Sequence, residues 1–229
     1  MTAKAKPYHH GDLPAALLAA AETLLRRDGI AGLGLRAIAR EAGVSHAAAK
    51  PHFGDIAGLL GELAAVGYDR LADALRAAGA RAATPRARNL AIAHAYVAFA
   101  REHQALFALM FRGELIDMTR PRLQAATGNA LRALASALGG EPATRAQAIE
   151  MTAGWAYVHG LATLLVDGRL RGIIRVTDAF ADPDALVDAV LDATRVSADT
   201  RRARNRAGAS TDTAASAPKR HRAPRSATA

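Results

Sequence analysis

The chain of 229 residues is basic, with a formal net charge of +9, and its residues are 51% hydrophobic but only 4% aromatic. Since much of the hydrophobic share is alanine and β-branched runs are few, we expect a tightly packed helical core. There is no cysteine, which excludes disulfides and thiolate metal sites and fits a cytoplasmic protein. The sequence has neither an uninterrupted apolar stretch of about 18 residues nor a secretory signal, so we expect no membrane association.

The spacing of apolar residues predicts a succession of amphipathic helices and no sheet. The predicted helices lie at about 13–27, 35–42, 46–52, 56–78, 86–102, 103–111, 117–138, 144–167 and 182–195. Gly139 to Pro142 separates two of them, and Asp182-Pro183 is typical of a helix cap followed by the first helical position. Residues 173–177, IIRVT, are the one strand-like stretch, and we assign them to a loop.

Residues 34–53, from Gly34 to Phe53, have the spacing of a helix-turn-helix unit. A short helix with an apolar face is followed by a Gly43-Val44 turn, and Ser45 is then a suitable N-cap for the second helix. In such a unit the second helix enters the major groove of DNA and the first crosses the phosphate backbone. The candidate DNA-binding residues of this unit and of the N-terminal arm are Lys6, Tyr8, Arg36, Ser45, His46, Ala47, Ala48, Lys50 and His52.

These side chains suit different groups of the DNA. Ser45 and the backbone amides at its helix start can bind phosphate oxygens. A small residue such as Ala47 can approach a thymine methyl group, and His46 can donate to a base edge. Two alternatives stay open at this point: Ser45 acts only as a cap, and His52 packs at a hinge without contacting DNA.

The segments EAGVS (residues 41–45), HFGD (residues 52–55) and Leu59-Leu60 resemble the N-terminal domain of TetR-type bacterial transcriptional regulators. Residues 8–13 and the Trp-x-x-x-His-Gly pattern at residues 155–160 are similar to one subgroup of that family. The resemblance implies a three-helix DNA-binding domain followed by a helical domain that binds a ligand and forms a homodimer, with its last two predicted helices in a four-helix bundle. It also implies a double-stranded DNA operator as partner and a small-molecule effector that releases a repressor from it.

The second short helix departs from the family pattern. Family members usually carry a tyrosine where Lys50 stands and a lysine where Ile56 stands, and both usual residues contact phosphates in relatives. Pro51 lacks an N–H and disfavours helical geometry at the residue before it, so we predict that the helix ends early, near Ala49 or Lys50. The alternative function is therefore a ligand-binding or interaction protein of the same fold whose specific operator binding is weakened or lost.

Aromatic, histidine and methionine side chains in the second half are candidate ligand-binding residues. Trp155, His159 and Ala162 lie at i, i+4 and i+7 and so share one helix face, where a Trp–His pair can stack on and hydrogen-bond a ligand. The candidate set is His103, Phe107, Met110, Phe111, Trp155 and His159, with His94, Phe99 and Tyr157 as further members. The alternative is that Trp155 belongs to the core and that His159 is a buried histidine with satisfied hydrogen bonds.

No histidine or acidic cluster has metal-ligand spacing, and no nucleophile, base or phosphate loop stands out, so we expect no metal, no cofactor and no enzymatic activity. Residues 196–229 hold eight Lys or Arg against two acidic residues, a net +6. We predict four parts: a flexible basic arm at 1–10, a DNA-binding domain at 11–60, a ligand-binding and dimerisation domain at 61–195, and a disordered basic tail at 196–229.

Overall fold

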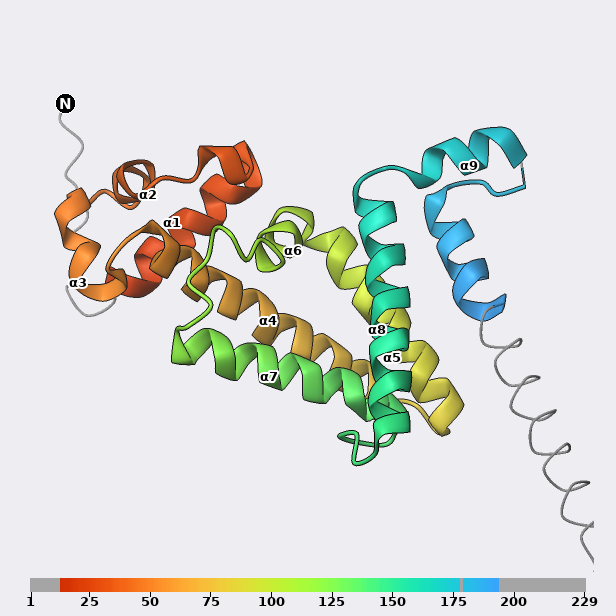
Figure 1. The fold of residues 1–229 in the computed structure, drawn as a ribbon. Helices are drawn as coiled ribbons and strands as arrows, with labels where there is room; N and C mark the ends of the chain where they lie inside the picture. The colour runs from red at the N-terminus through yellow and green to blue at the C-terminus, as the bar shows by residue number, and fades with distance from the viewer. Residues whose placement is uncertain (1–12, 178, 194–229) are drawn as a thin grey trace, which may run out of the picture. The chain divides into compact units, whose positions relative to one another are not determined.

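The computed structural model describes residues 13–177 and 179–193, and every regular element in these ranges is helical, which confirms the predicted all-α fold. The α-helices are α1 (Leu13–Asp28), α2 (Leu35–Glu41), α3 (Lys50–Phe53), α4 (Ile56–Ala80), α5 (Pro85–Glu102), α6 (Gln104–Met110), α7 (Pro121–Ala135), α8 (Arg145–Val166) and α9 (Leu170–Thr177) (Figure 1). Short 3-10 turns lie at η1 (Ile30–Gly32), η2 (His46–Ala48) and η3 (Ser136–Leu138), and residues 183–193 are helical. The arm with Lys6 and Tyr8, and the tail at 196–229, lie outside the described residues.

Local sequence signals account for where several helices begin. The hydroxyls of Thr84 and Thr144 each accept a hydrogen bond from the backbone N–H three residues later, at 3.1 and 3.2 Å. A glutamine at the third helical position completes a capping box at Thr144. The carboxylate of Asp182 accepts a backbone N–H at 2.8 Å in the same way, which confirms the predicted cap before Pro183.

The N-terminal helices pack through aliphatic and small side chains. Leu17 on α1, Ile38 on α2 and Leu59 on α4 are completely buried, and alanines between them let the backbones approach closely. Arg70 of α4 donates to both carboxylate oxygens of Glu22 on α1, at 2.7 and 2.9 Å, and this hydrogen bonding lowers the pKa of Glu22. The N-terminal helices are therefore held to α4 by an apolar core and a bidentate ion pair.

Helix α4 contacts α1, α5, α6 and α7 and is the central element of their packing. It runs unbroken across the predicted domain boundary at residue 60, with α7 beside it (Figure 1), and α5 contacts both α4 and α8. Arg122 of α7 forms an ion pair with Asp69 of α4. Helix α6 packs where Gly67 of α4 leaves room for Met110, since a Cβ at Gly67 would lie 2.6 Å from the Met110 sulfur.

Two sequence predictions need correction. Helix α7 begins at Pro121 rather than at residue 117, because proline disfavours helical geometry at Arg120, which is extended. The loop assigned to residues 173–177 is wrong, since they lie in α9. Leu170 and Ile173 lie at helical spacing, and Leu170 is buried. The burial of Leu170 on one face of the helix stabilises α9 by more than the strand preference of the β-branched residues opposes it.

By internal contacts the chain divides into Met1–Val187 and Asp188–Ala229, and the helix-turn-helix residues and the aromatic cluster described below lie in the first unit. Residues 188–193 are the described part of the second unit, and they are helical. Across the described ranges, no helix is both long and apolar enough to cross a bilayer.

Candidate functional site

The turn of the predicted helix-turn-helix unit is built as the sequence indicates. Gly43 adopts a φ of 71°, a left-handed conformation that glycine reaches without a steric cost. Its N–H donates to the Arg40 carbonyl at 3.1 Å, and the N–H of Val44 donates to the Ala39 carbonyl at 2.9 Å. These two bonds form a Schellman motif, which satisfies the last carbonyls of α2 and ends the helix sharply.

The segment after the turn is one 3-10 turn and one α-helical turn rather than a single helix. The 3-10 turn η2 passes through Ala49, which is completely buried, into α3. Ser45 stands at the N-cap position of η2 in an extended conformation, but its side chain makes no capping hydrogen bond. Its hydroxyl is therefore not used by the helix that it precedes.

Pro51 does not end the helix, so the predicted end near Ala49 or Lys50 is wrong. It lies in the first turn of α3, where N–H groups have no acceptor within the helix and a missing donor costs little. The N–H of Phe53 bonds to the Ala49 carbonyl at 3.1 Å, and that of Gly54 bonds to the Lys50 carbonyl at 2.9 Å. The break in the helix lies before Pro51, at Ala49 between η2 and α3, and α3 continues to Phe53.

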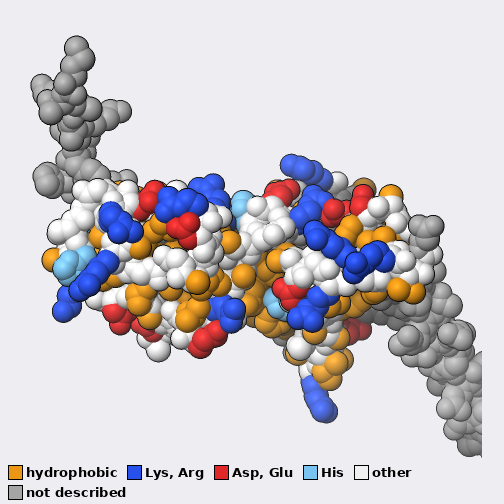
Figure 2. All heavy atoms as spheres, turned by 90° about the horizontal axis from the view of Figure 1, so that it is seen from above, with side chains coloured by type: hydrophobic (Ala, Val, Ile, Leu, Met, Phe, Trp, Pro, Cys, Tyr) orange, Lys and Arg blue, Asp and Glu red, His pale blue; other side chains and the backbone are white. Residues whose placement is uncertain are grey.

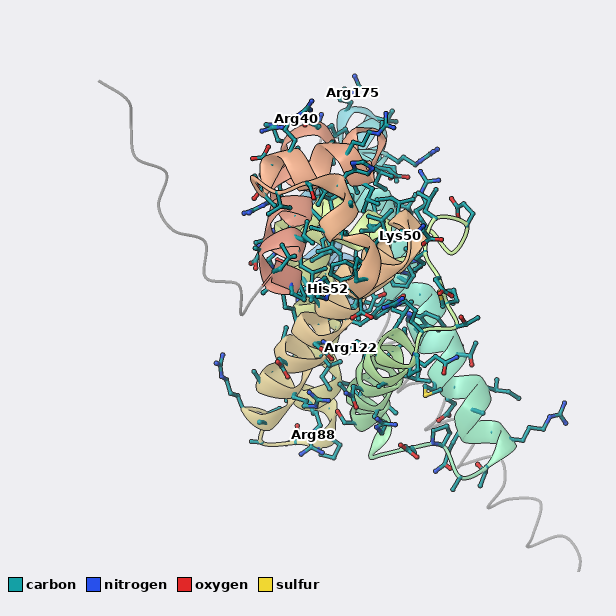
Figure 3. The ribbon with its side chains drawn as sticks, turned by 90° about the vertical axis from the view of Figure 1, so that its left-hand side faces the viewer. Arg40, Lys50, His52, Arg88, Arg122 and Arg175 are labelled. Carbon is teal, nitrogen blue, oxygen red and sulfur yellow. The ribbon has the colours of Figure 1, made fainter. Side chains whose placement is uncertain are left out.

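Most of the candidate DNA-binding residues on α2, η2 and α3 have exposed side chains. The exposed candidates are Arg36, Ser45, His46, Ala47, Lys50 and His52, whereas Ala48 is half-buried. Figure 3 shows Lys50 and His52 on α3 and Arg40 on α2, and Figure 2 shows blue cationic side chains beside a pale blue histidine at this end.

Arg40 was not among the sequence candidates. It lies four residues after Arg36 and so on the same face of α2, a spacing that could have revealed it. In the part of the chain that the structure describes, Arg36, Arg40 and Lys50 make no ion pair. These three cationic side chains are therefore exposed without an ion-pair partner in the described ranges.

A second feature that the sequence did not predict lies behind α3. The guanidinium of Arg120, at the end of the α6–α7 connection, donates to Glu62 at 2.9 Å and to the Phe53 carbonyl at 3.4 Å. The N–H of Asp117 in the same connection donates to the Ala57 carbonyl at 3.2 Å. The connection that follows α6 is thus bonded to both the end of α3 and the start of α4.

An aromatic cluster joins α5, α6 and α8. The Tyr96 hydroxyl lies 3.0 Å from Nδ1 of His159 and accepts from Nε1 of Trp155 at 3.4 Å. The His159 ring lies 5.5 Å from the ring of Phe107 and 4.3 Å from that of Phe111, measured between centroids. Burial lowers the pKa of His159 and raises that of Tyr96, so both side chains are uncharged at neutral pH.

The structure brings four of the six candidate ligand-binding residues together: Phe107, Phe111, Trp155 and His159. The side chain of Met110 packs instead against α4, and the ring of His103 lies 4.8 Å from that of Phe99. Trp155 is 38% exposed, so the alternative that it belongs to the core is wrong.

Two tyrosines of this region were missed by sequence reasoning, because a tyrosine on a helix carries no motif. Tyr96 sits at the centre of the cluster. The ring of Tyr68 lies 5.9 Å from that of Phe111, and its hydroxyl donates to the Met110 carbonyl at 2.8 Å. Burial raises the pKa of Tyr68 to about 12, so this hydroxyl remains a donor at neutral pH.

Comparison with known families covers both halves of the chain. Residues 17–63 match the model of bacterial regulatory proteins of the tetR family, and residues 89–194 match that of the tetracyclin repressor-like C-terminal domain. A solved structure of a protein with unknown function from Rhodococcus sp. RHA1 is 39% identical, with a TM-score of 0.63, and the match covers 82% of this chain and 96% of that one. The chain belongs to the TetR family. Its two matched domains are those of a transcriptional regulator with a helix-turn-helix DNA-binding domain.

Two less similar solved structures share the fold. A possible TetR family transcriptional regulator from Streptomyces coelicolor A3(2) is 20% identical, with a TM-score of 0.59, and the match covers 83% of this chain and 98% of that one. The fatty acid degradation regulator FadR from Bacillus halodurans is 16% identical, with a TM-score of 0.57, over 81% and 95% of the two chains. A comparison with curated proteins found no match.

Proposed function

We propose that this TetR-family protein is a cytoplasmic repressor that binds a palindromic operator and leaves it when a small molecule binds beside Trp155 and His159. The observation that carries the proposal is the positive charge of Arg36, Arg40 and Lys50 around a correctly formed helix-turn-helix turn. Contacts with phosphates supply much of the affinity of such proteins for DNA and set their register on the duplex. Ser45, His46 and Ala47 are the exposed residues proposed to read base edges.

The contacts of Arg120 support a route from the effector to the DNA. Phe111 touches His159 in the aromatic cluster and directly precedes the connection that ends at Arg120. Arg120 in turn holds the Phe53 carbonyl at the end of α3. An effector that binds more tightly when Phe111 is displaced would therefore shift α3 and lower the affinity for the operator. The loss of operator affinity is set by how much more tightly the effector binds that conformation.

A homodimer formed through α8 and residues 182–195 is part of the proposal. Helix α8 exposes large apolar side chains, among them Ile149 at 58% and Leu164 at 42%. Apolar side chains exposed along one helix are typical of an interface. The two-fold axis of such a dimer would place the η2–α3 segments of the two protomers about 34 Å apart, which is one helical turn of DNA. The four-part division at residues 10, 60 and 195, and membership of the Trp-x-x-x-His-Gly subgroup, also remain proposals.

Replacing Leu164 with glutamate is expected to convert the dimer into a monomer, because two buried carboxylates would face an apolar surface without a partner. Sedimentation velocity at micromolar concentration measures the change. The control is Leu131→Glu on α7, an equally exposed leucine at 43%, which should leave the dimer intact. If the Leu164→Glu variant dimerises with the same affinity between protomers as the unaltered protein, the interface lies elsewhere.

The decisive experiment compares the purified protein's binding to the DNA upstream of its own coding sequence with binding to a scrambled duplex. Fluorescence anisotropy at about 50 and 200 mM salt separates specific from non-specific binding, since purely electrostatic binding collapses with salt. A preference for the upstream DNA that persists at the higher salt supports the repressor. Equal and salt-sensitive binding to both duplexes, repeated with genomic fragments, contradicts it.

One observation favours a second candidate function. The segment that would enter the DNA groove consists of η2 and α3, which are separated at Ala49, so it has only one α-helical turn. Lys50 and Ile56 stand where family members usually carry phosphate-binding residues. A protein of the same fold that binds a ligand but no specific operator would show this pattern. It would give the salt-sensitive result while still binding its ligand at the aromatic cluster.

A further inference from the structure

The position of one proton in the aromatic cluster follows from burial. Tyr96 is 1% exposed, and its oxygen already accepts from Nε1 of Trp155. If the oxygen also accepted from His159, the phenolic hydrogen would be buried without an acceptor, which is costly. Tyr96 therefore donates to Nδ1 of His159 at 3.0 Å, and the proton of the neutral imidazole is on Nε2.

The Nε2–H of His159 is a donor that the protein leaves unused. No side chain or carbonyl of the described residues accepts from it. Within the same part of the chain, Asn89 Oδ1 is the one enclosed side-chain nitrogen or oxygen atom without a partner. Nε2 of His159 is therefore not completely enclosed, whereas Nδ1 of the same ring lies within hydrogen-bond distance of the buried Tyr96 hydroxyl.

The surroundings of this donor are aromatic and uncharged. Rings of Phe107, Phe111 and Trp155 lie around the imidazole, with centroids at 5.5, 4.3 and 6.3 Å. Burial alone lowers the pKa of His159, and no neighbouring charge contributes to the shift. A ligand at this place would thus meet one fixed donor and several ring faces and edges, and no charged side chain of the described residues perturbs the imidazole that it would contact.

We propose that the effector is an uncharged molecule with an aromatic body and one hydrogen-bond acceptor, such as a ketone or an ester. Its oxygen accepts from Nε2–H of His159, and its body lies against Trp155 and Phe111. A carboxylate of the same size binds less well, because it would lose hydration without gaining a countercharge. This inference rests on the proposed function and names the chemical class of its effector.

Three small probes of similar size test the acceptor: acetophenone, ethylbenzene and benzoate. Trp155 is the one tryptophan of the chain, so its indole N–H gives a single signal, separate from the backbone amides, that reports on this site. Titration of that signal in the full-length protein is expected to show acetophenone binding about threefold to tenfold more tightly than ethylbenzene, the range of one neutral hydrogen bond. Benzoate is expected to bind more weakly than acetophenone.

The variant His159→Phe keeps a ring but removes the donor, and it should make acetophenone and ethylbenzene bind equally. His103→Phe is the matched control, since the His103 ring lies at a tilt against Phe99 and has no described contact with the Tyr96–His159 pair, and it should keep the preference. The ¹⁵N shifts of His159 in the unaltered protein test the proton position independently of any variant.

Three results would overturn the inference: a proton on Nδ1, tightest binding of benzoate, or no difference between acetophenone and ethylbenzene in the unaltered protein. Absence of binding by all three probes at millimolar concentration would also overturn it. Operator binding without any probe is measured separately by anisotropy. If only the inference about the effector is wrong, specific operator binding is still observed. If the proposed function is wrong, specific operator binding is absent.

Discussion

Replacing Gly58 with alanine is expected to lower the free energy of unfolding by about 3 kcal/mol, the upper part of the usual range for overpacking. A Cβ at this position would overlap the carbonyl oxygen of Phe53 and lie 3.0 Å from Nη1 of Arg120. The Phe53 carbonyl is backbone at the end of α3, so it cannot move aside as a flexible side chain can. The end of α3 and the Arg120 contact must shift together.

Urea denaturation followed by circular dichroism measures the effect, at one fixed protein concentration because dimerisation contributes to stability. The control is Gly128→Ala in α7, where the nearest atom to the new Cβ is a terminal nitrogen of Arg132 at 3.5 Å. That change should stabilise the protein by up to about 1 kcal/mol through helix propensity. Equal stability of Gly58→Ala and the unaltered protein would mean that α3 and α4 do not meet as described.

Replacing Arg36 and Lys50 together with alanine is expected to weaken operator binding by on the order of a hundredfold, about tenfold for each charged contact. Both side chains are exposed at the helix-turn-helix end, and neither has an ion-pair partner in the described ranges. Because each phosphate contact releases counterions, the slope of log affinity against log salt should also become shallower by about 2. Anisotropy titrations at several salt concentrations give both quantities.

The matched control removes the same charge elsewhere. Arg81 and Arg145 are exposed, and the described structure shows no ion pair for either, but they lie at the end of α4 and the start of α8. Their double replacement with alanine should change operator affinity far less than the Arg36 and Lys50 pair does. Equal losses from the two pairs would show that the total charge of the protein, and not the position of Arg36 and Lys50, drives the binding.

The sequence predictions succeeded where the interactions are local. The Gly43 turn, the cap at Asp182 and the start of α8 after Thr144 each depend on hydrogen bonds spanning three to five residues. Such bonds can be recognised from residue types at fixed offsets. The prediction at Pro51 failed although its rule is sound, because the same proline is unfavourable inside a helix and well tolerated in its first turn.

The sequence by itself determined the helical fold, most helix boundaries and the helix-turn-helix unit, because these depend on periodicity and local capping, whereas the family was indicated by the resemblance of short segments such as EAGVS at residues 41–45. Only the tertiary structure decided that Tyr96 orients His159 and that Arg120 holds the Phe53 carbonyl, contacts that span 63 and 67 residues. The first contact depends on how α8 packs on α5 and the second on how α7 packs on α4, and packing is set by the summed fit of many small side chains. Neither the arginine before a helix nor the tyrosine within one carries a local sign of its distant partner.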